Sequence, residues 1–244
     1  MTALSARISS VCDQQPSLGA RSLHLWLGRR DTSDSAADFR RGVLARYSGL
    51  EPGQLRFATG VHGKPRLINS PRPIEFNVSH SGNWQVCAVT RDVPVGVDIE
   101  YCEPQREVLK LARRFFSVPE HQGLLREEEA LRAQRFYDLW TLKESRVKAL
   151  GTALAPELDS TDFNFETRVS GSAVGIRDRA RPGPAGMHYC LMEPRPGYRV
   201  ALCCIGSLAA GPELRLFRSV DGELFQREPL VYRGLSAGWS GGRD

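Results

Sequence analysis

The sequence of 244 residues predicts an α+β protein made of two similar halves. One observation is a long helical region in the middle of the chain, with its best part from Glu127 to Leu150. A second is a pair of apolar, strand-like segments of similar pattern, WQVCAVT at 84–90 and YRVALCCIG at 198–206. Each half also has the same order of a helix, a turn and then paired strands. We therefore expect two α+β subdomains at 1–94 and 95–210, followed by a C-terminal extension at 211–244.

The N-terminal half begins with a predicted helix at 36–48, because AADFRRGVLARYS places its apolar residues on one side. These apolar residues are Phe39, Val43, Leu44 and Tyr47. A turn follows, and three short apolar runs then predict strands that are joined by turn residues. The turn is expected at 60–65 and the strands at 74–78, 84–90 and 95–100.

The C-terminal half begins with a predicted helix at 107–116. Ser117 is then predicted to be a helix N-cap, with Glu120 as its capping-box partner. The long helical region that follows is expected to break near Gly123. Gly151 is a natural C-terminal cap for that region. The remaining elements are a strand at 163–169, a Gly/Pro/Arg-rich loop at 177–186 and a hairpin of strands at 188–192 and 198–205. The extension is expected to end in a mobile tail, SAGWSGGRD.

Composition narrows the class of protein. Apolar residues make up 41% and charged residues 25% of the chain, as in ordinary globular proteins, and no apolar run approaches the roughly 18 residues of a membrane span. The six cysteines form no C-x-x-C pair and the first residues do not resemble a signal peptide, so we expect a cytoplasmic protein. The net charge of +5 predicts an anionic partner, and leaves nucleic acid, membrane, a phosphorylated cofactor and an acidic protein open.

Two carboxylates follow one another on the predicted strand VGVDIE at 95–100. Side chains alternate along a strand, so Asp98 and Glu100 share one face, roughly 7 Å apart, while Val97 and Ile99 face the core. Two carboxylates in this arrangement can hold a hard divalent cation. Taken alone, the pair is more often only an exposed polar face at a strand end.

The segment WTLKESRVKALG at 140–151 places Trp140, Glu144 and Lys148 on one stripe of a helix. An ordinary solvent-exposed Glu–Lys pair is the alternative interpretation of this spacing. For Lys143, a structural role and a catalytic role both remain open.

Two further motifs are polar. FNVSHSG at 76–82 predicts a turn that presents Ser79, His80 and backbone N–H groups to an anion. It has no G-x-S-x-G pattern around either serine, which argues against a nucleophilic triad. GKP at 63–65 lacks the remainder of a Walker loop, which argues against an NTPase.

In this order, the four motifs GKP, FNVSHS, VGVDIE and WTLKESRVKALG resemble those of the Sfp-type 4′-phosphopantetheinyl transferase family. The resemblance covers about 90 residues in the middle of the chain, from Gly63 to Gly151. It implies a fold of two similar α+β halves related by a pseudo-two-fold axis, with coenzyme A bound in the cleft between them. It also implies that Asp98, Glu100 and Glu144 bind Mg²⁺ on the coenzyme A diphosphate.

The resemblance further implies roles for residues around the metal. Glu144 would act as general base towards a serine hydroxyl, directly or through water, and Lys148 would sit beside the diphosphate and stabilise the leaving group. Ser79 and His80 would hold the 3′-phosphate of coenzyme A, and Lys64 with Pro65 would lie beside the adenosine end. The family also uses basic residues of its N-terminal helix on the 3′-phosphate, for which Arg40, Arg41 and Arg46 are candidates.

The expected function is therefore transfer of 4′-phosphopantetheine from coenzyme A to a serine of an acyl or peptidyl carrier protein, with release of 3′,5′-ADP. The resemblance implies a monomer and leaves the preferred carrier open. The alternative is a non-catalytic module that binds coenzyme A or a carrier. A basic nucleic-acid-binding domain is a third interpretation, but no motif interleaves aromatic with basic residues as such domains do. We therefore expect neither nucleic acid nor membrane as a partner.

Overall fold

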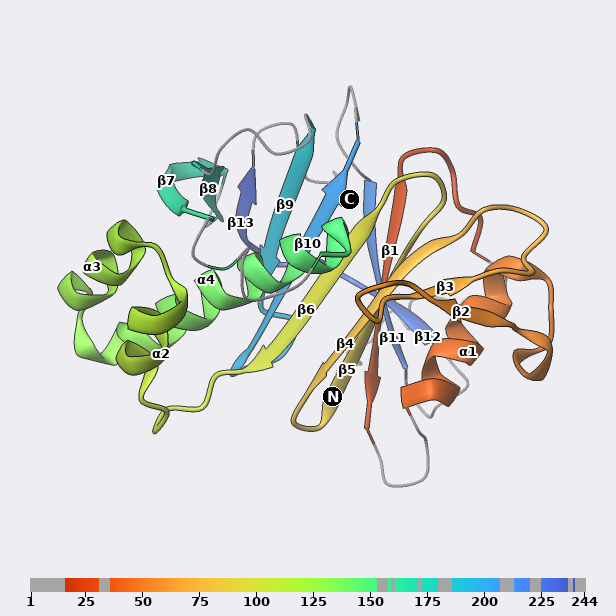
Figure 1. Ribbon diagram of the computed structural model, residues 1–244, viewed down its shortest axis with the longest axis horizontal. Helices are drawn as coiled ribbons and strands as arrows, with labels where there is room; N and C mark the ends of the chain where they lie inside the picture. The colour runs from red at the N-terminus through yellow and green to blue at the C-terminus, as the bar shows by residue number, and fades with distance from the viewer. Residues whose placement is uncertain are drawn as a thin grey trace, which may run out of the picture.

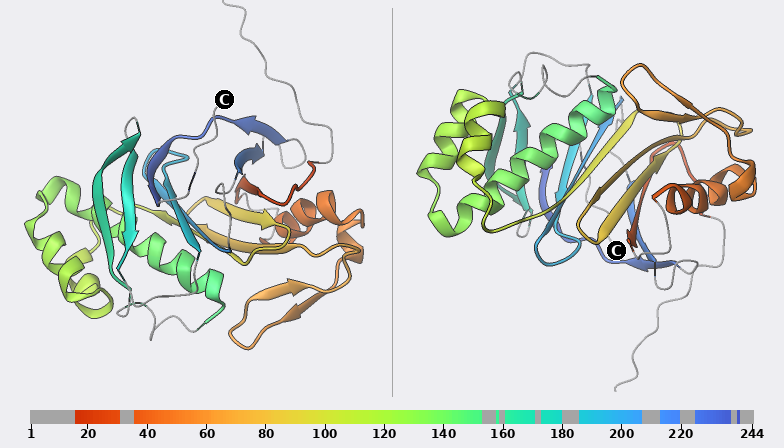
Figure 2. Two further views of the ribbon diagram at one scale, coloured as in Figure 1. Left: turned by 90° about the horizontal axis from the view of Figure 1, so that it is seen from above. Right: turned by 60° about the horizontal axis from the view of Figure 1, so that its bottom comes forward.

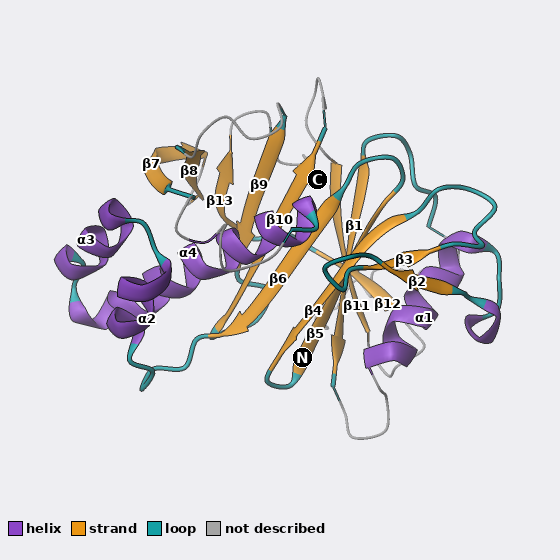
Figure 3. Cartoon of the chain, in the orientation of Figure 1, coloured by secondary structure: helices purple, strands orange, loops and turns teal. Residues whose placement is uncertain are grey.

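Two β-sheets pack against each other between two layers of helices in the computed structural model of the chain (Figure 1). The structure describes residues 16–30, 36–152, 158, 161–170, 173–179, 186–206, 213–219, 225–236 and 239. Helix α1 covers one side of the molecule, and helices α2, α3 and α4 cover the other (Figure 3). The prediction of an α+β fold is confirmed.

The first sheet has the strand order β12-β11-β1-β5-β4. Its strands are β1 (Ser22–Arg29), β4 (Glu75–Ser81), β5 (Trp84–Thr90), β11 (Glu213–Ser219) and β12 (Phe225–Glu228). Helix α1 (Ala36–Ser48) has the predicted bounds and packs Val43 and Leu44 against Trp26 and Cys87 on the outer face of this sheet. The inner face contributes Leu25 to a core that is shared with the second sheet.

The second sheet has the order β6-β10-β9-β13-β8-β7. Its strands are β6 (Val95–Tyr101), β7 (Phe163–Ser170), β8 (Ala173–Asp178), β9 (Met187–Met192), β10 (Tyr198–Ile205) and β13 (Tyr232–Ser236). Val97 and Ile99 of β6 face the core between the sheets. The opposite face lies under α2 (Val108–Phe115), α3 (Val118–Arg126) and α4 (Glu129–Leu150), with α4 running along β6 and β10.

A small two-stranded hairpin stands apart from both sheets. It consists of β2 (Phe57–Thr59) and β3 (Pro65–Leu67), follows the 3₁₀ turn η1 (Pro52–Gln54), and projects as an arm in Figure 2. The turn expected at 60–65 is the tip of this hairpin, and Gly63 adopts a φ of 84° there. Among the described helices, none is both long and apolar enough to cross a membrane.

Both predicted helix caps are confirmed. Ser117 accepts a hydrogen bond from the backbone of Glu120, whose side chain accepts one from the Ser117 N–H, and Gly151 ends α4 with a φ of 67°. The expected break at Gly123 is wrong, because α3 continues through that residue. The interruption comes at Glu127 and Glu128, where the backbone is extended.

The polar turn expected at Ser79 to Ser81 is also wrong. Strand β4 continues through Ser81, and the turn lies at Gly82, whose φ of 52° suits glycine. Adjacent side chains of a strand point to opposite faces, so Ser79 and Ser81 share one face while His80 points to the other.

Strands β1 and β8, and the three strands of the C-terminal extension, were not predicted. Every residue from Leu23 to Gly28 is buried, so β1 lacks the alternation by which a half-exposed strand is recognised. β11 pairs in parallel with β1, and β13 lies between β9 and β8, so the described part of the extension completes both sheets. The expected loop at 177–186 falls partly outside the described residues, as does the end of the expected tail. The division of the chain between 94 and 95 stays a prediction.

Candidate active site

Strand β6 and helix α4 approach each other closely enough to bring their polar residues together. A Cβ atom on Gly96 would lie 2.0 Å from the backbone oxygen of Ser145 and 2.3 Å from the backbone nitrogen of Ala149. Only glycine permits such a contact between a strand and a helix backbone. The glycine of VGVDIE therefore allows the carboxylates of β6 to meet the charged stripe of α4.

Asp98 is the centre of the polar contacts at this junction. Its Oδ1 atom accepts hydrogen bonds from the Lys148 ammonium group at 2.6 Å and from the Ser79 hydroxyl at 2.8 Å. Lys148 also donates to the Ser79 Oγ at 3.1 Å, which closes a triangle of three side chains from β4, β6 and α4. Asp98 is only 3% exposed, and its Oδ2 atom is buried without a hydrogen-bond partner among the described residues.

Glu100 lies beyond Asp98 on the same face of β6. Its Oε2 atom accepts a hydrogen bond from the Ser81 hydroxyl at 2.8 Å. Burial raises the pKa of Glu100, and the nearby carboxylate of Asp98 raises it further. The two residues of the predicted pair therefore lie in a partly buried site and not on an exposed strand face.

Glu144 completes a set of three crowded carboxyl groups. Burial is the main cause that raises its pKa to about 7, and the charge of Asp98 adds to the effect. Lys148 opposes this effect by lowering the pKa of Glu144. The pKa of Lys148 itself is raised, because the surrounding carboxylates outweigh the effect of its burial. The charges of three carboxyl groups, those of Asp98, Glu144 and Glu100, thus act on one ammonium group.

The chemistry of this set fits a hard divalent cation. No group of three or more His, Cys, Asp or Glu side chains is already arranged as a metal site in the described part of the chain. However, carboxylate oxygens are the ligands that Mg²⁺ prefers, and the buried Oδ2 of Asp98 lacks a partner. A bound cation would satisfy this oxygen, and its charge would counteract both the burial and the repulsion by Asp98 that raise the pKa values of Glu100 and Glu144.

Lys64 joins the β2–β3 hairpin to this junction. Its ammonium group donates hydrogen bonds to the backbone oxygens of Val95 and Lys148, both at 2.9 Å. Pro65, the next residue, begins β3. The lysine of GKP therefore contacts the start of β6 and the end of α4 through their backbones.

His80 lies on the other face of β4, beside a residue that the sequence analysis did not single out. Its Nδ1 atom is 3.2 Å from a guanidinium nitrogen of Arg30. Burial lowers the pKa of His80, and the charge of Arg30 lowers it further. The two residues are 50 positions apart, so only the antiparallel pairing of β1 with β5, which continues to Arg30 and Asn83, reveals their proximity.

Comparison with known proteins agrees with this arrangement. A family model described as the 4′-phosphopantetheinyl transferase superfamily matches residues 94–203, which include β6 and α4. The 4′-phosphopantetheinyl transferase Sfp of Bacillus subtilis is 35% identical over 164 residues, 67% of this chain and 69% of the relative. The 4′-phosphopantetheinyl transferase gsp of Aneurinibacillus migulanus is 36% identical over 170 residues, 68% of this chain and 65% of the relative.

The chain belongs to the Sfp-type 4′-phosphopantetheinyl transferase family. Among solved structures, the holo-[acyl-carrier-protein] synthase of Thermotoga maritima aligns with 58% of this chain and 86% of its own. Its 21% identity and TM-score of 0.33 make it a distant match.

The ammonium group of Lys143 in this transferase pairs with a carboxylate outside the set of Asp98, Glu100 and Glu144. The side chain of Lys143 is fully buried and forms an ion pair with Glu120 of α3 at 2.8 Å. The ammonium group also donates to the hydroxyl and backbone oxygens of Thr161 at 2.7 Å. Of the two roles that the sequence left open, these contacts are structural, since they join α4 to α3 and to the segment before β7.

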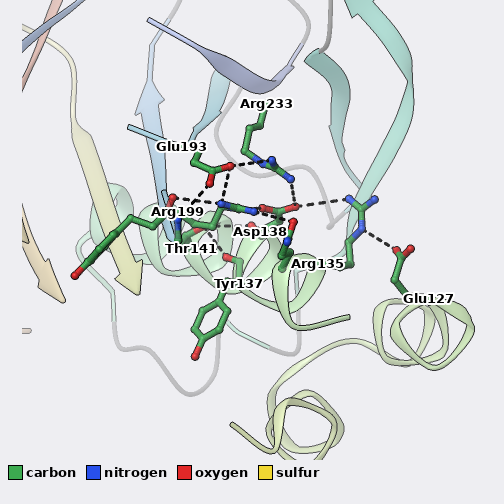
Figure 4. A network of polar contacts seen from close by, with 11 residues as sticks. Glu127, Arg135, Tyr137, Asp138, Thr141, Glu193, Arg199 and Arg233 are labelled. Atoms are coloured by element: carbon green, nitrogen blue, oxygen red, sulfur yellow. Dashed lines mark hydrogen bonds and ion pairs between the residues drawn. The ribbon is translucent and has the colours of Figure 1, made fainter. Parts of the chain in front are cut away.

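An ionic network fixes the first half of α4 in the transferase (Figure 4). Asp138 pairs with Arg199 of β10 at 2.8 Å and with Arg233 of β13 at 3.6 Å. Glu193 contacts the same two arginines, at 3.0 and 3.1 Å. The network ties α4 to two strands of the second sheet and so limits how far its second half, with Glu144 and Lys148, can move.

The three arginines of α1 that the family resemblance pointed to lie over aromatic rings. Arg40 and Arg41 stack on Phe57, at 4.4 and 5.2 Å from the ring centre, and Arg46 lies 5.6 Å from the ring centre of Trp26. Arg41 also donates to the backbone oxygens of Pro52 and Leu55. The proposed contact of these arginines with a phosphate stays a prediction.

Proposed function

We propose that this transferase moves the 4′-phosphopantetheine group of coenzyme A to a serine hydroxyl of an acyl or peptidyl carrier protein, releases 3′,5′-ADP and requires Mg²⁺. The observation that carries the proposal is the ion pair of Asp98 with Lys148 at the contact of β6 with α4, where Ser79 of the other sheet joins them. Glu100 lies on the same face of β6 as Asp98. The site thus draws residues from both halves, as a cofactor bound between them requires.

Asp98, Glu100 and Glu144 would hold the Mg²⁺ ion through their carboxylate oxygens. When bound, the ion neutralises the negative charge of the diphosphate and of the phosphoryl group that is transferred. The supporting evidence is the donor set itself: three crowded carboxyl groups, one of which has a buried oxygen without a partner.

Glu144 is proposed as the general base. The serine oxygen of the carrier attacks the phosphorus atom that bears pantetheine, and Glu144 takes the hydroxyl proton, directly or through a water molecule. The bond between this phosphorus and the bridging oxygen of 3′,5′-ADP then breaks. Without the cation, burial and the charge of Asp98 raise the pKa of Glu144 to about 7. A bound Mg²⁺ would lower this pKa and so keep the carboxylate unprotonated and able to accept the proton.

Lys148 is proposed to stabilise the leaving group. Its ammonium group stays charged, because the neighbouring carboxylates raise its pKa, and its side chain is 28% exposed. Such a group can donate to the oxygen of 3′,5′-ADP on which negative charge develops.

The 3′-phosphate of coenzyme A is proposed to bind near His80. The pair of His80 with Arg30 supports this placement, because two basic side chains contact each other there and would attract an anion. Ser79, Arg40 and Arg46 remain proposed contacts of the cofactor, as do Lys64 and Pro65 near its adenosine end.

The alternative is a module that binds coenzyme A or a carrier without catalysis. The presence of all three carboxyl groups near Lys148 favours an enzyme. Burying carboxylates of like charge together costs free energy, and binding of coenzyme A alone does not require it. A monomeric state and a cytoplasmic location also remain proposals.

Intact-mass spectrometry tests the proposal. An apo carrier protein incubated with the transferase, coenzyme A and Mg²⁺ is expected to gain one phosphopantetheine mass on its serine. EDTA and the Glu144→Ala substitution should each abolish the gain, while Ser145→Ala, which alters the next residue of the same helix, should keep it. Activity that is unchanged in Glu144→Ala would contradict the mechanism. Coenzyme A binding without transfer to any of several carriers would favour the non-catalytic module.

A further inference from the structure

The two halves meet along the edge strands of their sheets. Strand β4 ends the first sheet and β6 ends the second, and the two strands lie side by side (Figure 1). Side chains of β4 form hydrogen bonds to β6, and the two strands belong to different sheets. Three polar residues of β4, spaced two apart, therefore lie along this seam: Asn77, Ser79 and Ser81.

Each of the three makes at least one hydrogen bond across the seam. The side-chain oxygen of Asn77 accepts from the backbone nitrogen of Val97 at 2.9 Å, within the buried interior. Ser79 and Ser81 donate to Asp98 and Glu100, both at 2.8 Å. The period of two along β4 matches the period of two between the carboxylates, because both strands expose alternate residues to the seam. Ser79 thus contacts Asp98, and Ser81 contacts Glu100.

The hydroxyl group of Ser81 has a single hydrogen, and the contacts of its oxygen show which atom this hydrogen is donated to. Its oxygen accepts a hydrogen bond from the backbone nitrogen of Tyr101 at 3.0 Å. Its hydrogen therefore goes to Oε2 of Glu100. Ser81 thus connects the backbone of β6 to a carboxylate of the same strand, and fixes one carboxylate oxygen of Glu100.

The turn that follows Ser81 is held in place from the other half. A Cβ atom on Gly82 would lie 2.6 Å from the hydroxyl oxygen of Tyr198, so a larger residue would displace that hydroxyl, and the φ of 52° also favours glycine. The backbone nitrogen of Asn83 donates to the same hydroxyl at 3.3 Å. The end of β4 is therefore anchored to β10, and Ser81 is presented to Glu100 from a fixed backbone.

We infer that Ser81 is a positioning residue, which orients the Glu100 carboxylate for divalent cation binding through the hydrogen bond at 2.8 Å. The inference rests on the proposed function, since it assumes that Glu100 is a metal ligand. Groups that hold a metal-binding carboxylate are typically worth about 10- to 100-fold in metal affinity or activity.

Direct binding of Mn²⁺ to the full chain, followed by electron paramagnetic resonance in the absence of coenzyme A, tests the inference. Ser81→Ala should weaken Mn²⁺ binding by about 10-fold or more. Ser81→Thr, which keeps the hydroxyl group, should restore most of the affinity. Ser145→Ala is the matched control, because it removes a hydroxyl beside Glu144 that donates only to the backbone oxygen of Leu142.

A double-substitution cycle separates a role through Glu100 from a general loss of structure. In a Glu100→Gln background, Ser81→Ala should cause no further loss of Mn²⁺ affinity, because the carboxylate that it orients is gone. In carrier modification, Ser81→Ala should raise the Mg²⁺ concentration required for half-maximal rate and leave the KM for coenzyme A nearly unchanged.

The inference is overturned if Ser81→Ala binds Mn²⁺ as tightly as the unsubstituted protein, or if Ser145→Ala weakens binding to the same extent. Additive losses in the double-substitution cycle would also overturn it. These results leave the proposed function intact wherever the unsubstituted protein still modifies the carrier. Failure of the unsubstituted protein to modify any carrier would instead count against the proposed function, whichever way Mn²⁺ binding responds to Ser81→Ala.

Discussion

The ammonium group of Lys64 donates a hydrogen bond to the backbone oxygen of Lys148 at 2.9 Å. Because Lys148 lies in the last turn of α4, Lys64 places a positive charge at the helix end, where backbone carbonyl oxygens lack partners within the helix. It also contacts the backbone oxygen of Val95, the first residue of β6. Lys64 therefore fastens the hairpin arm to the two elements that carry the proposed catalytic groups.

Replacement of Lys64 by methionine is expected to lower the free energy of unfolding by about 2 kcal/mol, because two hydrogen bonds from a charged group are lost. Urea unfolding followed by circular dichroism measures this loss. If the contact with coenzyme A implied by the family resemblance dominates instead, the KM for coenzyme A will rise while stability stays the same.

Gly96→Ala should separate β6 from α4. The new methyl group would overlap backbone atoms of Ser145 and Ala149, which cannot rotate away, so we expect a loss of about 3 kcal/mol or more in stability and a large loss of carrier modification. Gly123→Ala is the matched control, because that glycine lies inside α3 with open space around it. This control should stabilise the protein by up to about 1 kcal/mol. Equal behaviour of the two variants would contradict the close contact.

Lys143→Met should destabilise the protein by about 3–5 kcal/mol, because it leaves the buried carboxylate of Glu120 without its cation. Chemical denaturation measures this effect. The double variant Lys143→Met/Glu120→Leu should recover much of the lost stability, since no unpaired charge then remains. Folded Lys143→Met that has full stability but no transferase activity would indicate the catalytic role instead.

Lys148→Ala should lower turnover far more than the affinity for coenzyme A, because its ammonium group is proposed to act on the charge of the departing 3′,5′-ADP. Steady-state kinetics with a carrier protein, together with calorimetric binding of coenzyme A, separate the two effects. An equal loss in binding and turnover would make Lys148 a simple anchor for the diphosphate.

His24, a fully buried residue of β1, should contribute a loss of stability in mild acid, which the raised pKa of Glu144 opposes over the same pH range. Burial lowers the pKa of His24 from 6.5 to about 4, and the charge of Arg215 contributes. Between these two pH values the unfolded chain binds a proton that the folded chain does not. The contribution of His24 to the free energy of unfolding therefore decreases as pH falls through this window, by roughly 3 kcal/mol.

Denaturant unfolding at pH 7 and pH 4.5 measures the effect of His24. The variant His24→Asn, which keeps a side chain able to hydrogen-bond the Tyr47 hydroxyl, should lose much less stability over the same range. If the free energy of unfolding changes between the two pH values by the same amount in the wild-type protein and in the variant, His24 does not destabilise the protein in acid.

The sequence predicted the elements whose own residues define them. Helix α1 has the expected bounds because its apolar residues recur at helical spacing, and the α3 cap forms as expected because Ser117 and Glu120 satisfy each other locally. The motifs VGVDIE and WTLKESRVKALG, with GKP and FNVSHS, also indicated the family, which the comparisons confirm.

Contacts between distant segments could not be predicted in the same way. Strand β1 is buried on both faces, so its sequence does not alternate between apolar and polar residues. Strands β11 to β13 are short, and pairing with neighbouring strands in the sheets defines them. The proximity of Arg30 to His80 depends on strand pairing, and that of Ser81 to Glu100 depends on how two edge strands meet.

The sequence by itself determined the helices with local caps, the alternation that puts Asp98 and Glu100 on one face, and the residue types available for a metal and a phosphate. The tertiary structure alone decided which of these groups meet: Lys148 with Asp98, Ser81 with Glu100, and Lys143 with Glu120 instead of the site. The physical reason is that helix spacing and caps depend on residues a few positions apart. Packing of two sheets and a helix, in contrast, joins residues that are 19 to 50 positions apart and depends on the whole chain at once.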